Sequence, residues 1–586
     1  MVDLKVKPFY LNNDQIYWVE ETIASMTVEE KIGQLFANLG VSRNEGYLKE
    51  ILSKYHIGTA RYNGGSAEEI FEQNRILQKN SKIPVFIASN TEGGGDGACN
   101  DGTPVGYPVK VGATGDKKYA YLMGKVCGTE AEAVGCNMLF SPITDINMNW
   151  RNPIISKRCF ADNAETVLEF SREYYRGVHE NSNCACCMKH FPGDGVDERD
   201  QHLSNSVNSL SVEQWDNSFG LVYKGMIDEG IEAVMAGHIM QPAYSRFLNP
   251  ELTDEEIMPA TLSKELLTGL LRGKLGFNGV IYTDASHMVG MTCRMKRSEI
   301  LPSAIAAGCD QFLFFNDMDE DFGYMMDGYK NGIITEERLH DALARVLGLK
   351  AKMNLTAPFD LTREKLPIVG CPEHKAIAEE IAEKSITLVK NLDNIFPVTP
   401  DKYKRIMIMP AKGLSAPSIF DLIMAGPKKR PEESLKEMLE QEGFTVSLYE
   451  SPLVKYQNAK TPEEKQKYGN AYFAAKSSIE DFVSKQDLII TFMNVGGYGQ
   501  NVERVGWGMS KGGGEIPWYV HEIPVVVLSL GSPFCLIDVP HARTYINAFA
   551  NNDYTLHAFV NKLVGRTEFE GVNNVDAFCS KWDTHF

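Results

Sequence analysis

The sequence predicts an α/β protein of two domains, a (β/α)8 barrel of the TIM type followed by a smaller open α/β sandwich domain. The chain has 586 residues, which is too long for one compact core and favours two large domains. From about residue 55 to residue 350, short apolar runs alternate with amphipathic stretches of helical length, as in repeated βα units. The runs also end in polar residues, which is typical of a barrel whose site lies at the carboxyl ends of its strands.

We expect the barrel to span residues 1–355. Its predicted strands are six apolar runs: IPVFIAS (83–89), MLFSPI (138–143), CACCM (184–188), IEAVMA (231–236), GVIYT (279–283) and FLFF (312–315). Stretches with helical periodicity, such as AETVLEFSREYYRGV, lie between them. The polar residues that follow these runs are Asn90, Glu92, Asp145, Lys189, His190, His238, Asp284, Asn316 and Asp317. Six strands with such endings predict one site at the mouth of the barrel.

The second domain is expected at residues 377–586, after a linker at 356–376. The segment around the linker carries three prolines and has no clear periodicity. A predicted helix, HKAIAEEIAEKSITLVKN, follows it. The predicted strands of the second domain are RIMIMP, DLIITFMN, PVVVLSL and TYINAFA.

Composition and charge exclude several classes of protein. With 43% hydrophobic and 23% charged residues, the chain is neither disordered nor a polytopic membrane protein. The formal charge of -18 repels polyphosphates and anionic membranes, so no nucleic acid and no membrane partner is expected. The start of the chain has no apolar segment of signal-peptide length, which predicts a cytoplasmic protein.

The twelve cysteines are scattered, and Cys184, Cys186 and Cys187 lie together in an apolar run. The spacing from Cys184 to Cys187 fits a C-x-x-C pair, but no second pair stands at zinc-site spacing. We therefore expect reduced thiols packed in a strand. No metal and no cofactor is expected, because histidines and carboxylates do not cluster at ligand spacing.

The segment richest in chemistry runs from Lys189 through His190 to His202. A strand ends in a cation and an imidazole, and a glycine-rich loop then places Asp200 two residues before His202. In an extended loop such residues project to the same side, so the carboxylate can bind one imidazole nitrogen while the other faces a substrate. A lone D-x-H pair is more often part of an ordinary solvated loop, so the prediction depends on the neighbouring motifs.

A second motif is the segment 259–288, in which an amphipathic helix leads through Gly276–Gly279 into a strand that ends at Asp284. A carboxylate at the tip of a barrel strand can attack the anomeric carbon of a sugar. A capping or salt-bridging aspartate is the alternative, since such residues are common at strand ends.

Segments 186–202 and 259–288 resemble glycoside hydrolase family 3, in particular its β-N-acetylglucosaminidase branch. That branch has KHFPGxG, a D-x-H loop dyad and a strand of the form GF-x-G-v-x-x-[ST]-D. The resemblance also covers IGQLF (32–36), EGG (92–94), residues 136–160, MAGHI (235–239) and, more loosely, AEKSITLVKN (382–391). These segments follow the order of the family and extend over most of the first domain.

The resemblance implies roles for individual residues. Asp284 would be the nucleophile, and His202 the acid/base with Asp200 as its partner. Asp145 would support the site. The implied substrate-binding residues are Asn90, Glu92, Arg158, Lys189, His190 and His238, of which His238 fits sugar contact and a supporting role equally well.

Several departures from the family pattern bear on the sugar, and two of them are Thr91 and Gly95, which stand where the family has glutamine and arginine. Asn90 stands where the family has an aspartate that binds distant hydroxyls, and it lacks the charge that favours tight binding. Asp194 replaces a histidine of KHFPGHG, and Ala285 follows Asp284 where an aspartate or tryptophan is common. These changes leave the reacting residues in place and leave the identity of the sugar open.

The expected function is a retaining, exo-acting β-N-acetylhexosaminidase that acts on terminal β-linked N-acetylglucosamine or N-acetylgalactosamine, and a homodimer is possible. Three alternatives stay open. The enzyme could be a family 3 β-glycosidase for another sugar, such as a β-glucosidase. It could be a phosphorylase, because a neutral imidazole does not repel phosphate as a carboxylate would. It could also be a non-catalytic carbohydrate-binding protein, although the sequence keeps both reacting residues.

Overall fold

A computed structural model describes residues 2–357, 361–413, 429–473, 478–496, 504–507 and 516–580. The chain forms two compact units. Unit 1 comprises Met1–Pro108 and Asp116–Ile377, and unit 2 comprises Val109–Gly115 and Ala378–Phe586.

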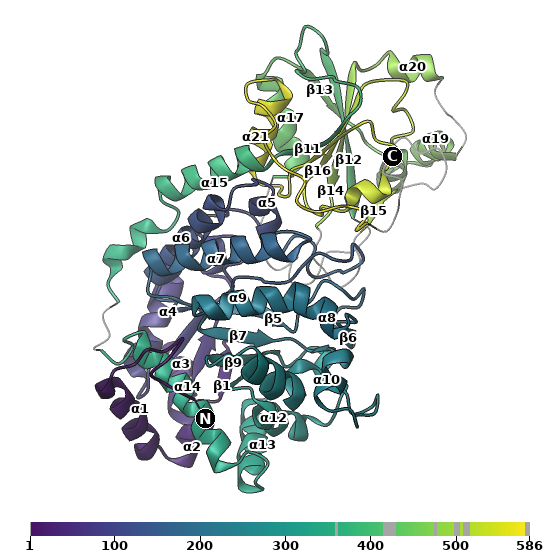
Figure 1. Ribbon diagram of the computed structural model, residues 1–586. Helices are drawn as coiled ribbons and strands as arrows, with labels where there is room; N and C mark the ends of the chain where they lie inside the picture. Colours follow the sequence, from purple (N-terminus) through teal and green to yellow (C-terminus); the bar gives the residue numbers. More distant parts are fainter. Residues whose placement is uncertain are drawn as a thin grey trace. The chain divides into compact units, whose positions relative to one another are not determined.

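Unit 1 is built on a closed barrel of eight parallel strands (Figure 1). The strands follow the order β1-β10-β9-β7-β5-β4-β3-β2 around the barrel, and β1 pairs with β2 to close it. They are β1 (Phe36–Leu39), β2 (Thr59–Arg61), β3 (Phe86–Ser89), β4 (Met138–Leu139), β5 (Ala185–Phe191), β7 (Ala233–Ala236), β9 (Val280–Ala285) and β10 (Gln311–Leu313). The barrel confirms the predicted fold of the first domain. Strands β1 and β2 were not among the six predicted runs, because they are short and β2 is not apolar.

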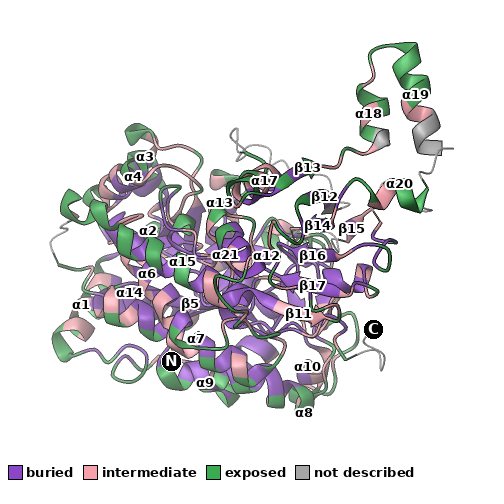
Figure 2. Cartoon of the chain, turned by 90° about the horizontal axis from the view of Figure 1, so that it is seen from above, coloured by how far each residue is buried: buried purple, intermediate pink, exposed green. Residues whose placement is uncertain are grey.

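Helices surround the barrel; most of them bury one face, whereas α14 (Glu336–Lys352) is buried on all sides from Asp341 to Ala351. They include α2 (Val28–Gly33), α3 (Glu45–Tyr55), α4 (Ala67–Asn80), α6 (Lys118–Ala133), α7 (Ala164–Asn181), α9 (Leu221–Glu229), η4 (Glu265–Lys274), α12 (Arg297–Ala307), α13 (Met318–Lys330) and α14. In α7 the buried residues Val167, Phe170, Tyr174 and Val178 recur every three or four positions, which places them on one side of the helix. Figure 2 shows both buried and exposed residues along these helices.

Smaller elements of unit 1 lie before the barrel and in its loops. They are α1 (Asn13–Ser25), β6 (Ser206–Val207), α8 (Val212–Trp215), β8 (Ile239–Met240), α10 (Pro242–Leu248) and α11 (Val289–Thr292). The short strands β6 and β8 pair in parallel beside the barrel. The segment α5 (Pro108–Gly112) begins at the last residue of the first stretch of unit 1. After α14 come η5 (Arg363–Ile368) and α15 (Pro372–Ser385), while residues 358–360 of the predicted linker lie outside the described residues.

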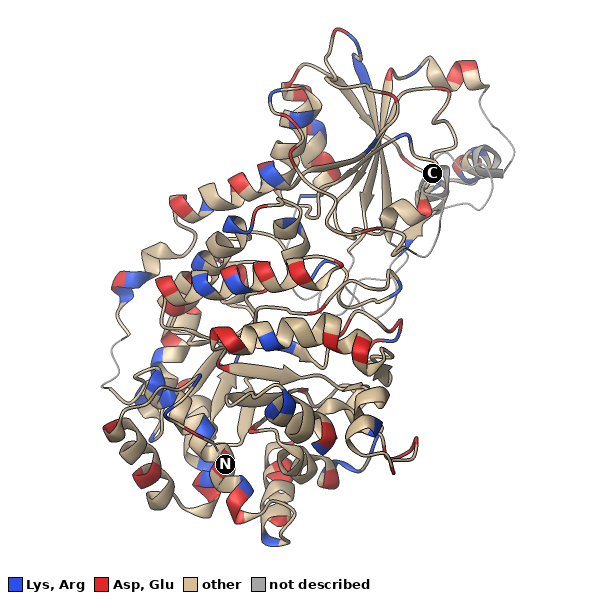
Figure 3. Cartoon of the chain, in the orientation of Figure 1, with Lys and Arg blue, Asp and Glu red and all other residues tan. Residues whose placement is uncertain are grey.

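Cys184, Cys186 and Cys187 are free and buried in or beside β5, which confirms that they pack as thiols. Figure 3 shows acidic and basic residues interspersed along outer helices such as α7. None of the helices in the described part of the chain is long and apolar enough to cross a membrane.

The amino end of the barrel holds a set of buried charges that are paired within the protein. Asp310, just before β10, accepts hydrogen bonds from Arg272 Nη2 at 2.7 Å and from the backbone N–H of Ile281 at 2.8 Å. Arg338 also forms an ion pair with Asp310. Lys350, which is fully buried in α14, donates from Nζ to Gln34 Oε1 at 2.6 Å. These contacts join the segments that enter the barrel.

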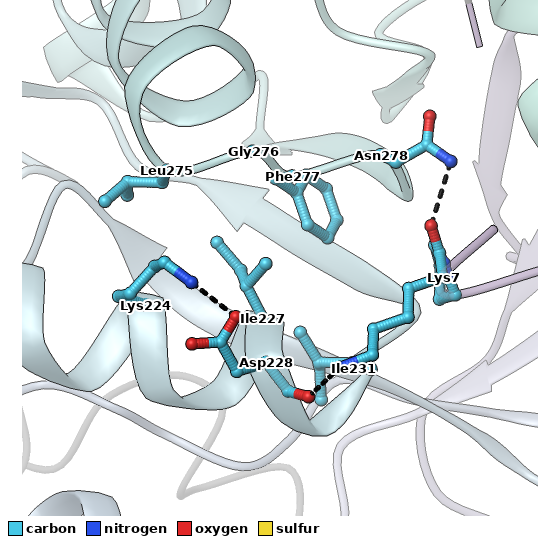
Figure 4. Close-up of a pocket in the computed structure, with 11 residues that line it drawn as sticks. Lys7, Lys224, Ile227, Asp228, Ile231, Leu275, Gly276, Phe277 and Asn278 are labelled. Atoms are coloured by element: carbon cyan, nitrogen blue, oxygen red, sulfur yellow. Dashed lines mark hydrogen bonds and ion pairs between the residues drawn. The ribbon is translucent and has the colours of Figure 1, made fainter. Parts of the chain in front are cut away.

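A pocket of about 200 Å³ lies near this amino end (Figure 4). Its walls come from the N-terminal segment at Lys7 and from the residues that precede β7 and β9. Lys7 donates to the backbone carbonyl of Asp228, whose carboxylate pairs with Lys224. The polar groups that Figure 4 joins by dashed lines are therefore already bonded to one another.

Unit 2 contains a seven-stranded sheet in the order β11-β17-β16-β14-β12-β13, with β15 paired to β12. Its strands are β11 (Thr387–Asn391), β12 (Arg405–Gly413), β13 (Thr445–Leu448), β14 (Leu488–Asn494), β15 (Val505–Gly506), β16 (Val525–Ser529) and β17 (Thr544–Asn547). Its helices include α17 (Pro431–Gln441), α18 (Pro452–Asn458), α19 (Pro462–Phe473), α20 (Ile479–Val483) and α21 (Asp553–Leu563). β11 and β15 run antiparallel to their neighbours, and the other paired strands are parallel. This sheet confirms the predicted α/β sandwich.

Residues 109–115 leave the barrel sequence and pack inside unit 2. Val572 donates its backbone N–H to the carbonyl of Ala113 at 2.8 Å, and Asn574 Nδ2 donates to the carbonyl of Val109 at 2.9 Å. Lys110 is fully buried and donates from Nζ to Thr555 Oγ1 at 3.1 Å. A segment between β3 and α6 thus belongs to the core of the second unit.

Candidate active site

Strand β9 directs Asp284 toward the carboxyl end of the barrel. Tyr282 lies inside the barrel, because its hydroxyl is 3.4 Å from Thr59 Oγ1 of β2, a strand that does not adjoin β9. Its ring also meets that of Phe140 edge to face, with the centroids 5.4 Å apart. Side chains two residues apart in a strand point to the same face. The pairing of β9 with β10 shifts register after Tyr282, but Asp284 interacts electrostatically with Lys189, His190, His202 and His238, which places it among the strand ends at the mouth of the barrel.

The surroundings of Asp284 keep its carboxylate ionised. Burial alone would raise the pKa of this group, but the charges of His190, His238 and His202 and a hydrogen bond from the backbone of Ala285 hold it below its ordinary value. The Ala285 N–H lies 2.7 Å from Asp284 Oδ1. Asp284 has no ion pair with any residue in the described ranges, so its charge is balanced at a distance rather than neutralised by a contact.

His202 and Asp200 form the dyad that the loop sequence predicts. His202 Nδ1 is 2.6 Å from Asp200 Oδ1, and the His202 backbone N–H donates to the same oxygen at 2.8 Å. Because the carboxylate accepts, Nδ1 carries the proton and Nε2 is left for a substrate. The imidazole is 38% exposed, which a group that exchanges protons with a ligand requires.

The pKa of His202 lies above its ordinary value. Burial lowers the pKa, but the hydrogen bond and charge of Asp200 and the charge of Asp284 outweigh it. The imidazole can therefore hold a proton near neutral pH.

Glu92, Arg158 and Lys189 form a buried cluster of charges, with Glu92 just after β3 and Lys189 on β5. Glu92 accepts from Arg158 Nε and Nη2 at 2.8 Å each, and Lys189 Nζ is 2.6 Å from Glu92 Oε1. Burial raises the pKa of Glu92, but the two cations hold it well below its ordinary range. Lys189 interacts electrostatically with Asp284. Glu92 thus fixes the directions of two cations, and we infer that it positions them rather than binding a sugar itself.

His190 is oriented by Asp145, as the strand endings suggest. His190 Nδ1 is 2.7 Å from Asp145 Oδ2, and Asp145 Oδ1 accepts from the His190 backbone N–H at 3.2 Å. This contact assigns the proton to Nδ1 and leaves Nε2 for another partner.

His238 does not fit the sugar-binding role that the resemblance implies. Its side chain is fully buried, Nδ1 lies 2.9 Å from Thr261 Oγ1, and Nε2 lies 2.9 Å from the carbonyl oxygen of Ala285. Both ring nitrogens are therefore bonded within the protein. The geometry favours the alternative, in which His238 supports the end of the strand that carries Asp284.

Two further strand ends face the mouth. Asn90 is partly exposed, and its amide has no hydrogen bond to any described residue, which leaves it available to a ligand. Arg61, the last residue of β2, shares the inward face with Thr59. Arg61 was missed because β2 was missed. The rule that strand ends form the site would have found it.

Asn316 and Asp317 do not join this group. The side chain of Asp317 caps α13 by accepting from the Glu320 N–H at 2.9 Å, and the Asn316 backbone donates to Asp321. The strand-end pattern was thus wrong at this one position, where a helix start supplies the reason for a polar residue.

Comparisons with known proteins identify the family of this chain. Residues 27–349 match the family described as "Glycosyl hydrolase family 3 N terminal domain". A Cellulomonas fimi protein named "Beta-N-acetylglucosaminidase/beta-glucosidase" is 38% identical over 587 residues, covering all of both chains. A "Beta-hexosaminidase A" of Pseudoalteromonas piscicida is 28% identical over 396 residues, which is 62% of this chain and 64% of that protein.

Solved structures resemble the whole chain. A structure named "Beta-glucoside phosphorylase BglX bound to 2FGlc" matches with a TM-score of 0.88 and 38% identity, covering 98% of this chain and 99% of that one. A family 3 β-N-acetylglucosaminidase from Paenibacillus sp. matches with a TM-score of 0.75 and 24% identity, covering 94% of this chain and 99% of that one. The second likeness shows the fold alone.

Proposed function

The chain belongs to glycosyl hydrolase family 3, and on that premise we propose that it cleaves terminal β-linked N-acetylglucosamine and glucose with retention of configuration. It is an enzyme that acts on glycosidic bonds of carbohydrates. The sugar, the acceptor and the roles of the residues below are our proposal.

In the proposed first step, the carboxylate of Asp284 attacks the anomeric carbon while protonated His202 donates its Nε2 proton to the departing glycosidic oxygen. The bond to the leaving group breaks and a covalent glycosyl-enzyme forms. In the second step an acceptor attacks the same carbon from the side that the leaving group left, the ester bond to Asp284 breaks, and neutral His202 takes up the proton when the acceptor is water. Two displacements restore the original configuration.

The observation that carries this proposal is the arrangement of two groups: Asp284 lies near the end of β9 with no ion pair among the described residues, and the bond to Asp200 leaves His202 Nε2 for a substrate. The pKa of Asp284 is lowered and that of His202 is raised, and each group contributes to the shift of the other. At neutral pH this arrangement supplies an ionised nucleophile beside a group that can hold a proton. Lys189, Arg158, His190 and Asn90 offer donors for the hydroxyls of the sugar.

The sugar range rests on the relatives and on Asn90. The full-length relative from Cellulomonas fimi carries both activities in its name, and two relatives that match part of the chain are named as hexosaminidases. Asn90 replaces a charged residue of the family pattern and can both donate and accept hydrogen bonds. We therefore propose that both N-acetylglucosaminides and glucosides are substrates.

Phosphate is a second candidate for the acceptor, in place of water. Two observations favour it: a protein 38% identical over 98% of this chain is named a β-glucoside phosphorylase, and the proposed acid is an imidazole. After the first step a neutral imidazole exerts no repulsion on an anionic acceptor, whereas a carboxylate would. Phosphorolysis would release the sugar 1-phosphate.

The test combines trapping with product analysis. A 2-deoxy-2-fluoro glycosyl fluoride should inactivate the enzyme, and mass spectrometry should find the added sugar on the peptide that contains Asp284. Aryl β-N-acetylglucosaminide and β-glucoside should then be digested with and without phosphate, and the products resolved. Free sugar under both conditions supports hydrolysis, and sugar 1-phosphate supports phosphorolysis.

Inactivity toward both glycosides, together with tight binding of the sugars, would favour the carbohydrate-binding alternative. Label on a residue other than Asp284 would overturn the proposed nucleophile.

A further inference from the structure

The loop that carries the proposed acid/base leaves β5 along a path that only glycines allow. Gly193 has φ +117° and Gly195 has φ +106°, a region that L side chains rarely adopt. A Cβ on Gly193 would lie 2.2 Å from the ring of Phe219, and one on Gly195 would lie 1.9 Å from the carbonyl oxygen of Ile146. The backbone therefore reaches Asp200 and His202 by a tightly confined route.

Gln201, between the two dyad residues, is almost completely buried while the imidazole beside it is partly exposed. Its Oε1 accepts from the backbone N–H of His238 at 2.7 Å, and its Nε2 lies at a longer 3.5 Å from Asp194 Oδ2. Its backbone carbonyl accepts from the Gly290 N–H at 2.9 Å. One residue thus connects the loop to the segments that follow β5, β7 and β9.

The groups that hold Gln201 are themselves fixed. Asp194 Oδ1 accepts from Asn152 Nδ2 at 2.7 Å, and the Asp194 backbone N–H donates to Asp145 Oδ1 at 2.7 Å. A Cβ on Gly290 would lie 2.8 Å from the Gln201 carbonyl oxygen and 3.0 Å from His238 Cβ, so the close approach at this point requires glycine.

The adjoining residue makes a parallel contact. The carbonyl of His202 accepts from the Val289 N–H at 3.0 Å, five residues beyond Asp284. The loop that carries the imidazole is therefore attached to the same segment that follows the carboxylate.

We propose that Gln201 is the positioning residue that holds the His202 imidazole over the Asp284 carboxylate, through its bonds to His238, Asp194 and Gly290. The inference rests on the proposed function, in which His202 donates a proton to the leaving group. Gln201 touches neither the substrate nor the reacting atoms. It acts by fixing where Nε2 of His202 lies.

The consequence is a defect confined to substrates that need a proton. A displacement of about 1 Å at a catalytic group can cost on the order of 100-fold in rate. A 2,4-dinitrophenolate leaves without protonation, whereas phenyl and alkyl leaving groups must receive a proton as they depart. Gln201→Ala should lower kcat/KM for phenyl and alkyl β-glycosides by about 10- to 100-fold and for the dinitrophenyl glycoside by no more than about threefold.

The experiment measures log kcat/KM against the pKa of the leaving group for the wild type, Gln201→Ala and His202→Ala. This ratio reports formation of the glycosyl-enzyme, whether water or phosphate accepts the sugar later. The expected result is a steep negative slope for both variants and a shallow one for the wild type. The dinitrophenyl glycoside needs no proton from the acid, so its rate reports the fraction of each variant that is folded.

Two outcomes separate the inference from the proposed function. If His202→Ala gives a steep slope and Gln201→Ala gives the slope of the wild type, the role of Gln201 is overturned and the proposed function stands. If His202→Ala itself keeps the slope of the wild type, His202 is not the acid, and the proposed function and this inference fall together.

A paired exchange tests the bond to Asp194 without leaving a cavity. Gln201→Glu places two carboxylates against each other, and Asp194→Asn places two amide groups there, so each single variant should show the steep slope. In the double variant the amide at position 194 donates to the carboxylate at position 201, while the other carboxylate oxygen still accepts from His238. Recovery of a shallow slope supports the proposed bond, and a double variant no better than the single ones overturns it.

Discussion

The two ends of the barrel use buried carboxylates in opposite ways. At the amino end, Asp310 is bonded directly to Arg272, Arg338 and the backbone of Ile281. At the carboxyl end, Asp284 receives one backbone hydrogen bond and no ion pair from the described residues, although three imidazoles act on its pKa. Complete pairing holds a charged side chain in place and favours the stability of the fold. Partial pairing leaves a charge able to form a new bond, which favours chemistry.

The comparison predicts its largest effect at Asp284. Asp284→Asn should lower kcat for every glycoside by about 10⁴-fold or more, because the amide cannot form the glycosyl-enzyme. The melting temperature should stay the same or rise, since the variant removes a buried charge that no contact neutralises. Steady-state rates and a thermal melt measure the two effects. A large fall in the melting temperature would contradict the contrast between the two ends.

At the amino end of the barrel we expect the opposite, which is a loss of stability without a loss of activity. Asp310→Ala should destabilise the protein by about 3–5 kcal/mol, because Arg272 and Arg338 lose the charge that compensates them. Activity per folded molecule should be unchanged. Denaturant unfolding followed by activity and fluorescence measures both quantities.

The matched control is Asp228→Ala, which removes one partner of an exposed pair with Lys224. Its cost should be no more than about 1 kcal/mol. Equal losses in the two variants would show that burial of the Asp310 pairs contributes nothing.

The pH profile gives the third effect. His202 must be protonated to act as the acid, so activity on poor leaving groups is present below its pKa and lost above it. Because that pKa is raised, the alkaline limb of kcat/KM should lie above 6.5, with a fall of about tenfold per pH unit beyond it. Asp284 must be ionised, and its lowered pKa places the acid limb below 3.8.

Asp200→Asn should move the alkaline limb to lower pH, because it removes the charge that raises the pKa of His202. Rates measured with a phenyl glycoside from pH 3 to pH 9 would show the shift. An unmoved limb would mean that Asp200 does not act on the group that titrates.

The smallest effect concerns Lys350. Burial lowers the pKa of its ammonium to about 7, so in the unfolded chain the lysine binds its proton more tightly than in the folded protein. Lys350 therefore adds stability as the pH rises above about 7 toward the pKa of the unfolded chain, and this contribution is lost as the pH falls. Lys350→Met should change stability by only about 1 kcal/mol at pH 7, because the relieved charge offsets the lost bond to Gln34.

The difference between Lys350→Met and the wild type should grow less favourable between pH 7 and pH 9. Unfolding midpoints at both pH values measure it. A difference independent of pH would show that Lys350 keeps its proton in the folded protein.

The sequence alone locates those parts of the site that depend on residues close together along the chain. Strand position and loop spacing located Asp284, Asp200 and His202, but their roles came from the resemblance to family 3, because a D-x-H pair alone more often belongs to a solvated loop. The barrel followed from the alternation of runs and helices. Such patterns lie within short windows of the chain.

The remaining features depend on residues that are distant in sequence. The position of His238 at a strand end was visible, but the bonds of its ring to Thr261 and Ala285 were not, so the sequence left sugar contact and a supporting role equally open. Neither periodicity nor composition marks Gln201 in the sequence, because its role depends on its hydrogen bonds to His238, Asp194 and Gly290. Local patterns locate a side chain on its element, while the partners that decide its role come from the folded chain.

Because residues 109–115 belong to unit 2, they limit where this chain can be divided into its two units. A gene fragment that ended near Ile377 would still encode Val109, Lys110 and Val111, which are completely buried in the intact second unit, and would deprive them of that core. A single cut near Ile377 would therefore not separate the two units as this chain folds them.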